Sequence, residues 1–241
     1  MQQVVEEALA RVLGGEQVRV QASGRTDAGV HARQQVVAFR CESERSARGI
    51  LGGLNHHLPA DVACLAARPA PEGFDPRRWT RVKTYRYRIL SRRARCAFRA
   101  GFTWHLAQKL DLGRLQAEAA ALVGRHDFRS FQAQGCAALH PVRTLAAVRI
   151  TAREDELRLE FDGHGFLRHQ VRIMVGSLVQ VGLGRRPLGW IAEVLAAQDR
   201  RRSGPTAPAE GLWLWAVDCP DHPRSAAEPA PEDPDAELLP D

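Results

Sequence analysis

Lysine is almost absent from this chain: only Lys83 and Lys109 among the 34 lysine and arginine residues are lysine. Arginine can hold a phosphate through two parallel hydrogen bonds and can stack on a nucleic-acid base. The composition therefore favours a nucleic-acid partner. A GC-rich genome that encodes arginine wherever lysine would serve explains the same composition about equally well.

Several other features are missing. The five cysteines form no C-x-x-C pair, which argues against a zinc ribbon or redox motif and favours reduced thiols in the cytoplasm. His31, His56 and His57 show no metal-ligand spacing, so we expect no metal. No apolar run approaches the ~20 residues that span a bilayer, and no signal peptide opens the chain. Membrane insertion and secretion are therefore not expected.

The chain divides by composition. Residues 220–241 are rich in proline and alanine and hold seven acids against one arginine, so we expect a disordered acidic tail. The remaining 219 residues then carry a net charge of +12. The connection at 69–78, PAPEGFDPRR, contains three prolines and suggests domains at 1–78 and 79–219.

Hydrophobic periodicity predicts an α+β protein rather than a regular βαβ repeat. Strands are indicated where apolar residues alternate and helices where they recur every three to four positions. The predicted helices are 2–13, 49–58, 111–124, 165–182 and 187–199, and the predicted strands are 17–22, 34–40, 82–90, 143–151, 157–163 and 212–218.

The first candidate site is GRTDAG at 24–29. Asp27 suits a tight turn, because its side chain can bond nearby backbone N–H groups. Glycines on both sides also leave room for a ligand, which suits a nucleophilic carboxylate. From these residues alone a structural turn is the somewhat better explanation.

The second candidate is a cluster of basic residues, His164, Arg168, His169 and Arg172, at the start of the apolar segment 165–182. On a helix Arg168 and Arg172 lie one turn apart. An arginine on an apolar helix needs an anion, because an unpaired buried charge costs several kcal/mol. That anion is either an acid on a neighbouring strand or Asp27, which an adjacent arginine would keep ionised.

The third candidate is Tyr85 with Tyr87, which face the same side of a strand. Buried cross-strand aromatics explain this pair more often than a base-stacking platform does.

Five ordered segments together resemble the tRNA pseudouridine synthase A family over nearly all of residues 2–219. The first contains the loop around Asp27, and the others follow in the family's order. They are SGRTDAGVHARQQVVAF at 23–39, KTYRYRI at 83–89, GRHDFRSF at 124–131, GFLRHQVRIMVGSLVQVG at 165–182 and GPTAPAEGLWLWAV at 204–217.

The resemblance implies two similar α+β subdomains that share a mostly antiparallel sheet flanked by helices, with the active-site cleft between them. It implies an isomerase that converts uridine to pseudouridine at positions 38, 39 and 40 of the tRNA anticodon arm, without cofactor or metal. The family is typically a homodimer with the tRNA lying across both subunits.

The resemblance also implies roles for single residues. Asp27 is the nucleophile and Arg172 pairs with it. Arg25 assists flipping of the target base. Tyr85 lies against the uracil, and we expect Arg168 to bind substrate.

Two departures from the family pattern stand out. The opening strand of the family, of the type Y-D-G, has no counterpart before Gln2, so we expect that the start lies further upstream. Gln170 stands where many members have methionine. A second hypothesis follows from the missing strand: a catalytically idle tRNA-binding module. A metal hydrolase that uses the histidines is not favoured.

Overall fold

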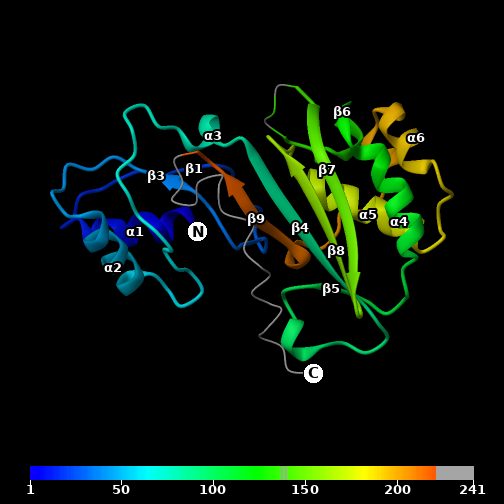
Figure 1. The fold of residues 1–241 in the computed structure, drawn as a ribbon, viewed down its shortest axis with the longest axis horizontal. Helices are drawn as coiled ribbons and strands as arrows, with labels where there is room; N and C mark the ends of the chain where they lie inside the picture. The colour runs from blue at the N-terminus through cyan, green and yellow to red at the C-terminus, as the bar shows by residue number, and fades with distance from the viewer. Residues whose placement is uncertain (137, 139, 221–241) are drawn as a thin grey trace. The chain divides into compact units, whose positions relative to one another are not determined.

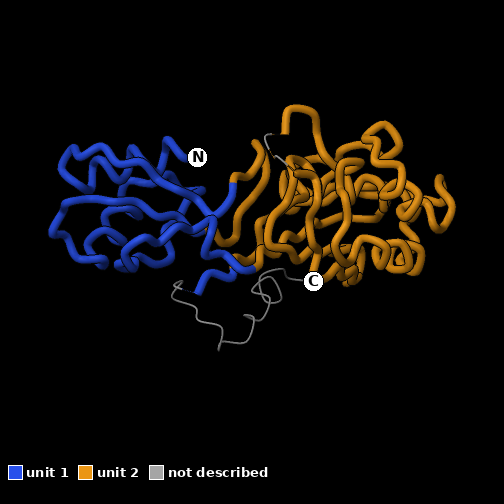
Figure 2. The backbone as a smooth tube through the Cα atoms, turned by 90° about the horizontal axis from the view of Figure 1, so that it is seen from above, with its two compact units in different colours: residues 1–24, 36–81, 218–241 blue, residues 25–35, 82–217 orange. Residues whose placement is uncertain are grey.

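A computed structural model describes residues 1–136, 138 and 140–220, and their contacts form two compact units (Figure 2). Unit 1 comprises residues 1–24, 36–81 and the described part of 218–241; unit 2 comprises 25–35 and 82–217. The division into domains at residue 78 stays a prediction. The predicted acidic tail lies outside the described residues from residue 221 onward.

Unit 1 contains three helices and a two-stranded antiparallel sheet. The helices are α1 (Gln2–Val12), α2 (Ala47–His57) and α3 (Pro76–Trp79), and the strands are β1 (Gln21–Ala22) and β3 (Val37–Ala38). Ser46 begins α2, because its side chain accepts a hydrogen bond from the backbone N–H of Gly49. The strands predicted at 17–22 and 34–40 are present but only two residues long.

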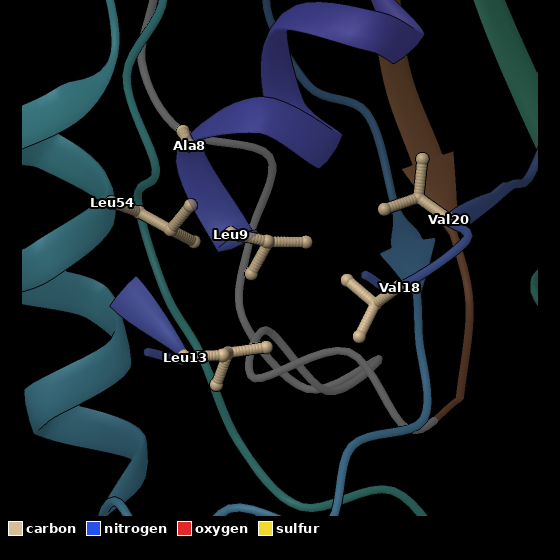
Figure 3. Close-up of a cluster of buried hydrophobic side chains, with 6 residues drawn as sticks. All are labelled: Ala8, Leu9, Leu13, Val18, Val20 and Leu54. Carbon is tan, nitrogen blue, oxygen red and sulfur yellow. The ribbon is translucent and has the colours of Figure 1, made fainter. Parts of the chain in front are cut away.

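The core of unit 1 lies between α1, α2 and the segment that leads into β1. Apolar positions of α1 repeat every three to four residues, which puts them on one face of the helix. Figure 3 shows this buried cluster, which consists of Ala8, Leu9, Leu13, Val18, Val20 and Leu54.

Unit 2 is built around a seven-stranded sheet, with the order β2-β9-β4-β8-β7-β6 and β5 beside β4. β4 pairs antiparallel with β8, as do β7 with β8 and β6 with β7, whereas β2 with β9 and β4 with β5 are parallel. The strands are β2 (His31–Ala32), β4 (Val82–Ser91), β5 (Trp104–Leu106), β6 (Gly124–Asp127), β7 (Val142–Arg153), β8 (Glu156–Gly163) and β9 (Leu212–Asp218).

Three helices lie together on one side of this sheet (Figure 1). They are α4 (Leu112–Ala119), α5 (Gln170–Gly182) and α6 (Trp190–Ala197). The shorter 3₁₀ turns are Ala97–Arg99, Ala120–Leu122, Arg129–Phe131, Arg200–Arg202 and Ala209–Gly211. The expected mixed α+β architecture, with a mostly antiparallel sheet flanked by helices, is confirmed.

α5 is the central helix of unit 2, and eleven of its thirteen residues are buried. This burial explains why its sequence is apolar on nearly every side. Among the described residues, no helix has both the length and the apolar character that crossing a membrane requires.

The prediction of a helix from residue 165 was wrong, because α5 begins at Gln170. The loop at 133–136 binds both backbone groups of Arg168. The Ala133 N–H donates to the Arg168 carbonyl, and the Arg168 N–H donates to the Cys136 sulfur. These bonds hold Arg168 outside the helix. Arg168 and Arg172 therefore do not share a helix face.

The helix predicted from Pro187 also begins later, at Trp190. Gly189 precedes it with φ 87°, a conformation that favours glycine. The buried carboxylate of Glu118 in α4 accepts from the backbone N–H groups of Gly189 and Ile191. A side chain distant in sequence therefore sets the first turn of α6, which local periodicity cannot reveal.

Candidate active site

The loop that carries Asp27 is anchored to the sheet of unit 2. The Val30 N–H donates to the Asp27 carbonyl, and Gly29 has φ 77°, so the chain turns sharply before β2. β2 then pairs in parallel with β9, with His31 beside Trp213. The turn is therefore real, and it is fixed immediately next to a strand of the main sheet.

Arg172, in the first turn of α5, forms an ion pair with Asp27. Its Nη1 lies 3.2 Å from Asp27 Oδ2, and its Nε donates to the Ala207 carbonyl at 2.8 Å. The exposed fractions of the two side chains are 15% for Arg172 and 31% for Asp27, so the carboxylate stays accessible to a ligand. Of the two anions considered from the sequence, the structure places Asp27 beside Arg172.

His169 is a second partner of the same carboxylate. Its Nε2 lies 3.3 Å from Asp27 Oδ2. Burial lowers the pKa of His169, and the positive charges of Arg172, Arg168 and Arg200 lower it further, while Asp27 acts in the opposite direction. The imidazole Nε2 therefore lies against the carboxylate oxygen in surroundings that disfavour its protonated form.

Tyr85 lies on β4 and is 8% exposed. Its ring packs edge-on against Phe166, with the ring centroids 4.9 Å apart. Burial raises the pKa of Tyr85 to about 12, and the charge of Asp27 contributes to the rise. The Tyr85 hydroxyl is therefore protonated and uncharged near neutral pH.

Tyr87, two residues along β4, is fully buried. Its hydroxyl donates to the Pro208 carbonyl at 2.7 Å. For Tyr87 these contacts support a buried core aromatic rather than a base-stacking platform. Its hydroxyl also helps to hold the segment at 204–208.

The segment at 204–208, GPTAP, is the part of the site whose role sequence reasoning missed. Its backbone packs directly on α5: the Gly204 N–H donates to Ser177 Oγ, and the Ala207 N–H donates to the Arg172 carbonyl. The Ala207 carbonyl in turn accepts from the Arg172 guanidinium. The segment therefore fixes both the backbone and the side chain of Arg172.

Arg168 and Arg25 do not contact the Asp27 carboxylate. Arg168 is exposed, and its Nη1 donates to the Gln134 carbonyl at 3.2 Å. Arg25 is exposed on the loop, and no residue in the described part of the chain forms a hydrogen bond or ion pair with it. The structure therefore brings together Asp27 and Arg172, with His169 added, and leaves Arg25 and Arg168 outside this contact.

His169 was part of the basic cluster noted in the sequence but not one of the residues chosen for the site. The only signal in the sequence was its spacing of three residues from Arg172. In the predicted helix from residue 165, that spacing would have put His169 and Arg172 close together on one helix. The described residues contain no group of three or more His, Cys, Asp or Glu side chains placed to hold an ion.

Alkaline titration gives a first test of this environment. Tyr85 and Tyr87 are the only two tyrosines, and burial raises the pKa of both. We therefore expect almost no tyrosinate absorbance near 295 nm at pH 10, where an exposed tyrosine is about half ionised.

The same shifts predict how stability depends on pH. A phenol whose pKa is raised by folding contributes stability that is complete below about pH 10 and is lost as the pH rises toward 12. Urea melts should therefore show a falling free energy of unfolding above about pH 10. A tyrosinate signal of half amplitude at pH 10 in the folded protein would contradict this burial.

Comparison with known proteins gives a consistent family. A family model described as tRNA pseudouridine synthase matches residues 1–77 and 119–220. The chain is 45% identical to the protein named tRNA pseudouridine synthase A of Myxococcus xanthus, over 90% of this chain and 82% of that protein. It is also 45% identical to the protein of the same name from Acidiphilium cryptum, over 90% of this chain and 86% of that protein. The one in Methylobacterium nodulans is 42% identical, over 94% and 89%.

The chain belongs to the tRNA pseudouridine synthase family. The enzyme is accordingly an isomerase, and its reaction converts uridine in tRNA to pseudouridine. Asp27, Arg172 and His169 lie inside the matched ranges, whereas Tyr85 lies between them.

Proposed function

We propose that the enzyme converts uridines 38, 39 and 40 in the anticodon arm of tRNA, with Asp27 as the nucleophile. The observation that carries the proposal is the accessible Asp27 carboxylate held by Arg172 at 3.2 Å. The motif resemblance around both residues supports the choice of substrate positions.

The reaction needs a group of this kind. The bond between C1′ and N1 of the nucleotide breaks, the uracil turns, and a bond between C1′ and C5 forms. The hydrogen on C5 leaves as a proton and N1 gains one, so no oxidant or reductant is needed. A carboxylate that adds to C1′ or to C6 divides this change into two easier steps and leaves unchanged at the end.

Other residues take supporting roles in the proposal. The target base cannot react while it is stacked, so it must be extruded at a cost of a few kcal/mol. Arg25, exposed on the same loop as Asp27, fills the space left by the base. Tyr85 packs against the uracil as a neutral phenol, and Arg168 contacts the RNA near the site.

The remaining parts of the proposal concern partners and place. The arginine-rich surface holds the anticodon arm through phosphate and 2′-hydroxyl contacts, a mode that follows RNA shape and so admits neighbouring uridines. We propose a homodimer in the cytoplasm that works without cofactor or metal. The idle binding module is not proposed, since family membership gives an enzyme and the Asp27–Arg172 pair is intact.

The test is a tRNA assay with uridines labelled with tritium at C5. Formation of the new C–C bond releases the C5 hydrogen to solvent, so tritium release counts turnovers. We expect release from an anticodon-arm RNA with uridines at 38, 39 and 40, and none when all three are cytidine. Release that persists without these uridines would contradict the choice of positions.

A further inference from the structure

Both partners of the Asp27 carboxylate bind the same oxygen atom. Arg172 Nη1 and His169 Nε2 lie 3.2 and 3.3 Å from Oδ2. Within residues 1–136, 138 and 140–220, no group donates a hydrogen bond to Oδ1. Oδ2 therefore accepts a hydrogen bond from Arg172 and lies against the His169 ring, whereas Oδ1 is left for the substrate.

His169 reaches Asp27 from an unusual backbone conformation. It has φ 59° and ψ 8°, the left-handed region, which is unfavourable for most residues other than glycine. Neighbouring bonds maintain it: the Leu167 N–H donates to Gln170 Oε1, and the Gln170 N–H donates to the Leu167 carbonyl. A strained conformation that its surroundings maintain is a frequent feature of functional sites.

We propose that His169 is a positioning residue for Asp27. The Nε2–H of the His169 ring holds Oδ2 of Asp27 beside Arg172 and leaves Oδ1 as the attacking oxygen. This inference rests on the proposed function, in which Asp27 is the nucleophile. A hydrogen bond from a positioned donor fixes the rotation of the carboxylate, and a misplacement of about 1 Å can cost about 100-fold in rate.

Burial and the charges around His169 together shift its pKa. Asp27 faces it from the loop, Arg172 from α5, Arg168 from the preceding loop and Arg200 from the Arg200–Arg202 turn. Burial is the largest effect on its pKa and, with the three arginines, lowers it despite Asp27. In the proposed arrangement the neutral ring carries its proton on Nε2, because a carboxylate only accepts hydrogen bonds.

Protonation of His169 changes what the ring does to the nucleophile. The imidazolium adds a second full positive charge beside Oδ2, which strengthens the bond to the carboxylate and weakens its tendency to attack. We therefore expect kcat to fall as the pH falls through the pKa of His169.

Two substitutions separate positioning from mere packing. In His169→Gln the amide Nε2–H replaces the ring Nε2–H but does not titrate. In His169→Asn the residue tolerates the left-handed backbone but is too short to reach Oδ2. We expect kcat to fall about 10- to 100-fold in His169→Asn, with the KM for tRNA and the melting temperature nearly unchanged.

In His169→Gln we expect kcat within severalfold of wild type and an acid limb that disappears or moves to lower pH. His56→Asn, at an exposed position of α2, serves as the matched control and should keep both the rate and the profile of wild type. Each protein is measured for single-turnover rate, KM and thermal melting between pH 5 and 9.

Other results would overturn the inference. A wild-type rate and pH profile in His169→Asn would mean that Asp27 needs no help from His169. Equal losses in both variants together with lowered melting temperatures would mean a structural role only. Asp27→Asn run beside them keeps the two proposals apart: an inactive Asp27→Asn with an unaffected His169→Asn refutes the positioning role alone, whereas an active Asp27→Asn refutes the proposed nucleophile.

Discussion

Asp27→Asn abolishes pseudouridine formation, with a loss on the order of 10⁴-fold or more in single-turnover rate. The amide has nearly the shape of the carboxylate and can still accept a hydrogen bond from Arg172 or His169. It has lost the negative charge that makes the oxygen a nucleophile. Tritium release from the anticodon-arm RNA measures the rate, and filter binding measures affinity for the same RNA.

Binding should survive this change, because phosphate contacts elsewhere supply most of the affinity. We expect the dissociation constant to stay within a few-fold of wild type. Asp61→Asn, which removes an exposed carboxylate in unit 1, is the matched control and should convert RNA at the wild-type rate. A variant at position 27 that still turns over at a tenth of the normal rate would rule out Asp27 as the nucleophile.

The sequence was informative about the site because its residues lie in short, strongly patterned segments. The glycines that flank Asp27 predicted a sharp turn, and the turn is present, with the Val30 N–H bonded to the Asp27 carbonyl. The need of Arg172 for an anion followed from its apolar surroundings. The catalytic roles of these residues still rest on the family resemblance and stay predictions.

Other features depend on contacts between distant residues, and no local pattern encodes them. The start of α5 at Gln170 is set by bonds from the loop at 133–136 to Arg168, which local periodicity cannot show. His169, the residue that precedes this later start, has a left-handed backbone. Its contact with Asp27 was therefore hidden until the helix start was known.

Short strands were missed for a related reason. β2 has two residues and β5 three, too few for alternation to be recognised. Each pairs in parallel with a longer strand: β2 with β9, and β5 with the last three residues of β4. Yet β2 is the strand that anchors the Asp27 loop, so the element least visible in the sequence holds the candidate nucleophile in place.

Gly176→Ala should destabilise the protein by about 3 kcal/mol, because the site has no room for a methyl group. A Cβ added at Gly176 would lie 1.8 Å from the Pro205 carbonyl oxygen, and the nearest atoms belong to backbone rather than to a side chain that could rotate away. Either α5 or the segment at 204–208 must therefore move. Urea melts monitored by circular dichroism measure the loss.

The same substitution should slow catalysis in the fraction that stays folded. The segment that must move contains Ala207, whose carbonyl and N–H both bind Arg172. A shift of about 1 Å there would displace Arg172 from Asp27 and lower kcat by about 100-fold. Gly52→Ala is the matched control, since a Cβ at that helical position meets nothing within 4 Å.

Gly52→Ala should leave activity unchanged and stabilise the protein by about 0.5–1 kcal/mol, because alanine loses less backbone entropy than glycine in a helix. Opposite signs from one chemical change at two helical glycines would show that close packing between α5 and the segment at 204–208 decides the result. If Gly176→Ala matched wild type in both stability and rate, the inferred close packing between α5 and the segment at 204–208 would be contradicted. The inference that this segment supports Arg172 would be contradicted with it.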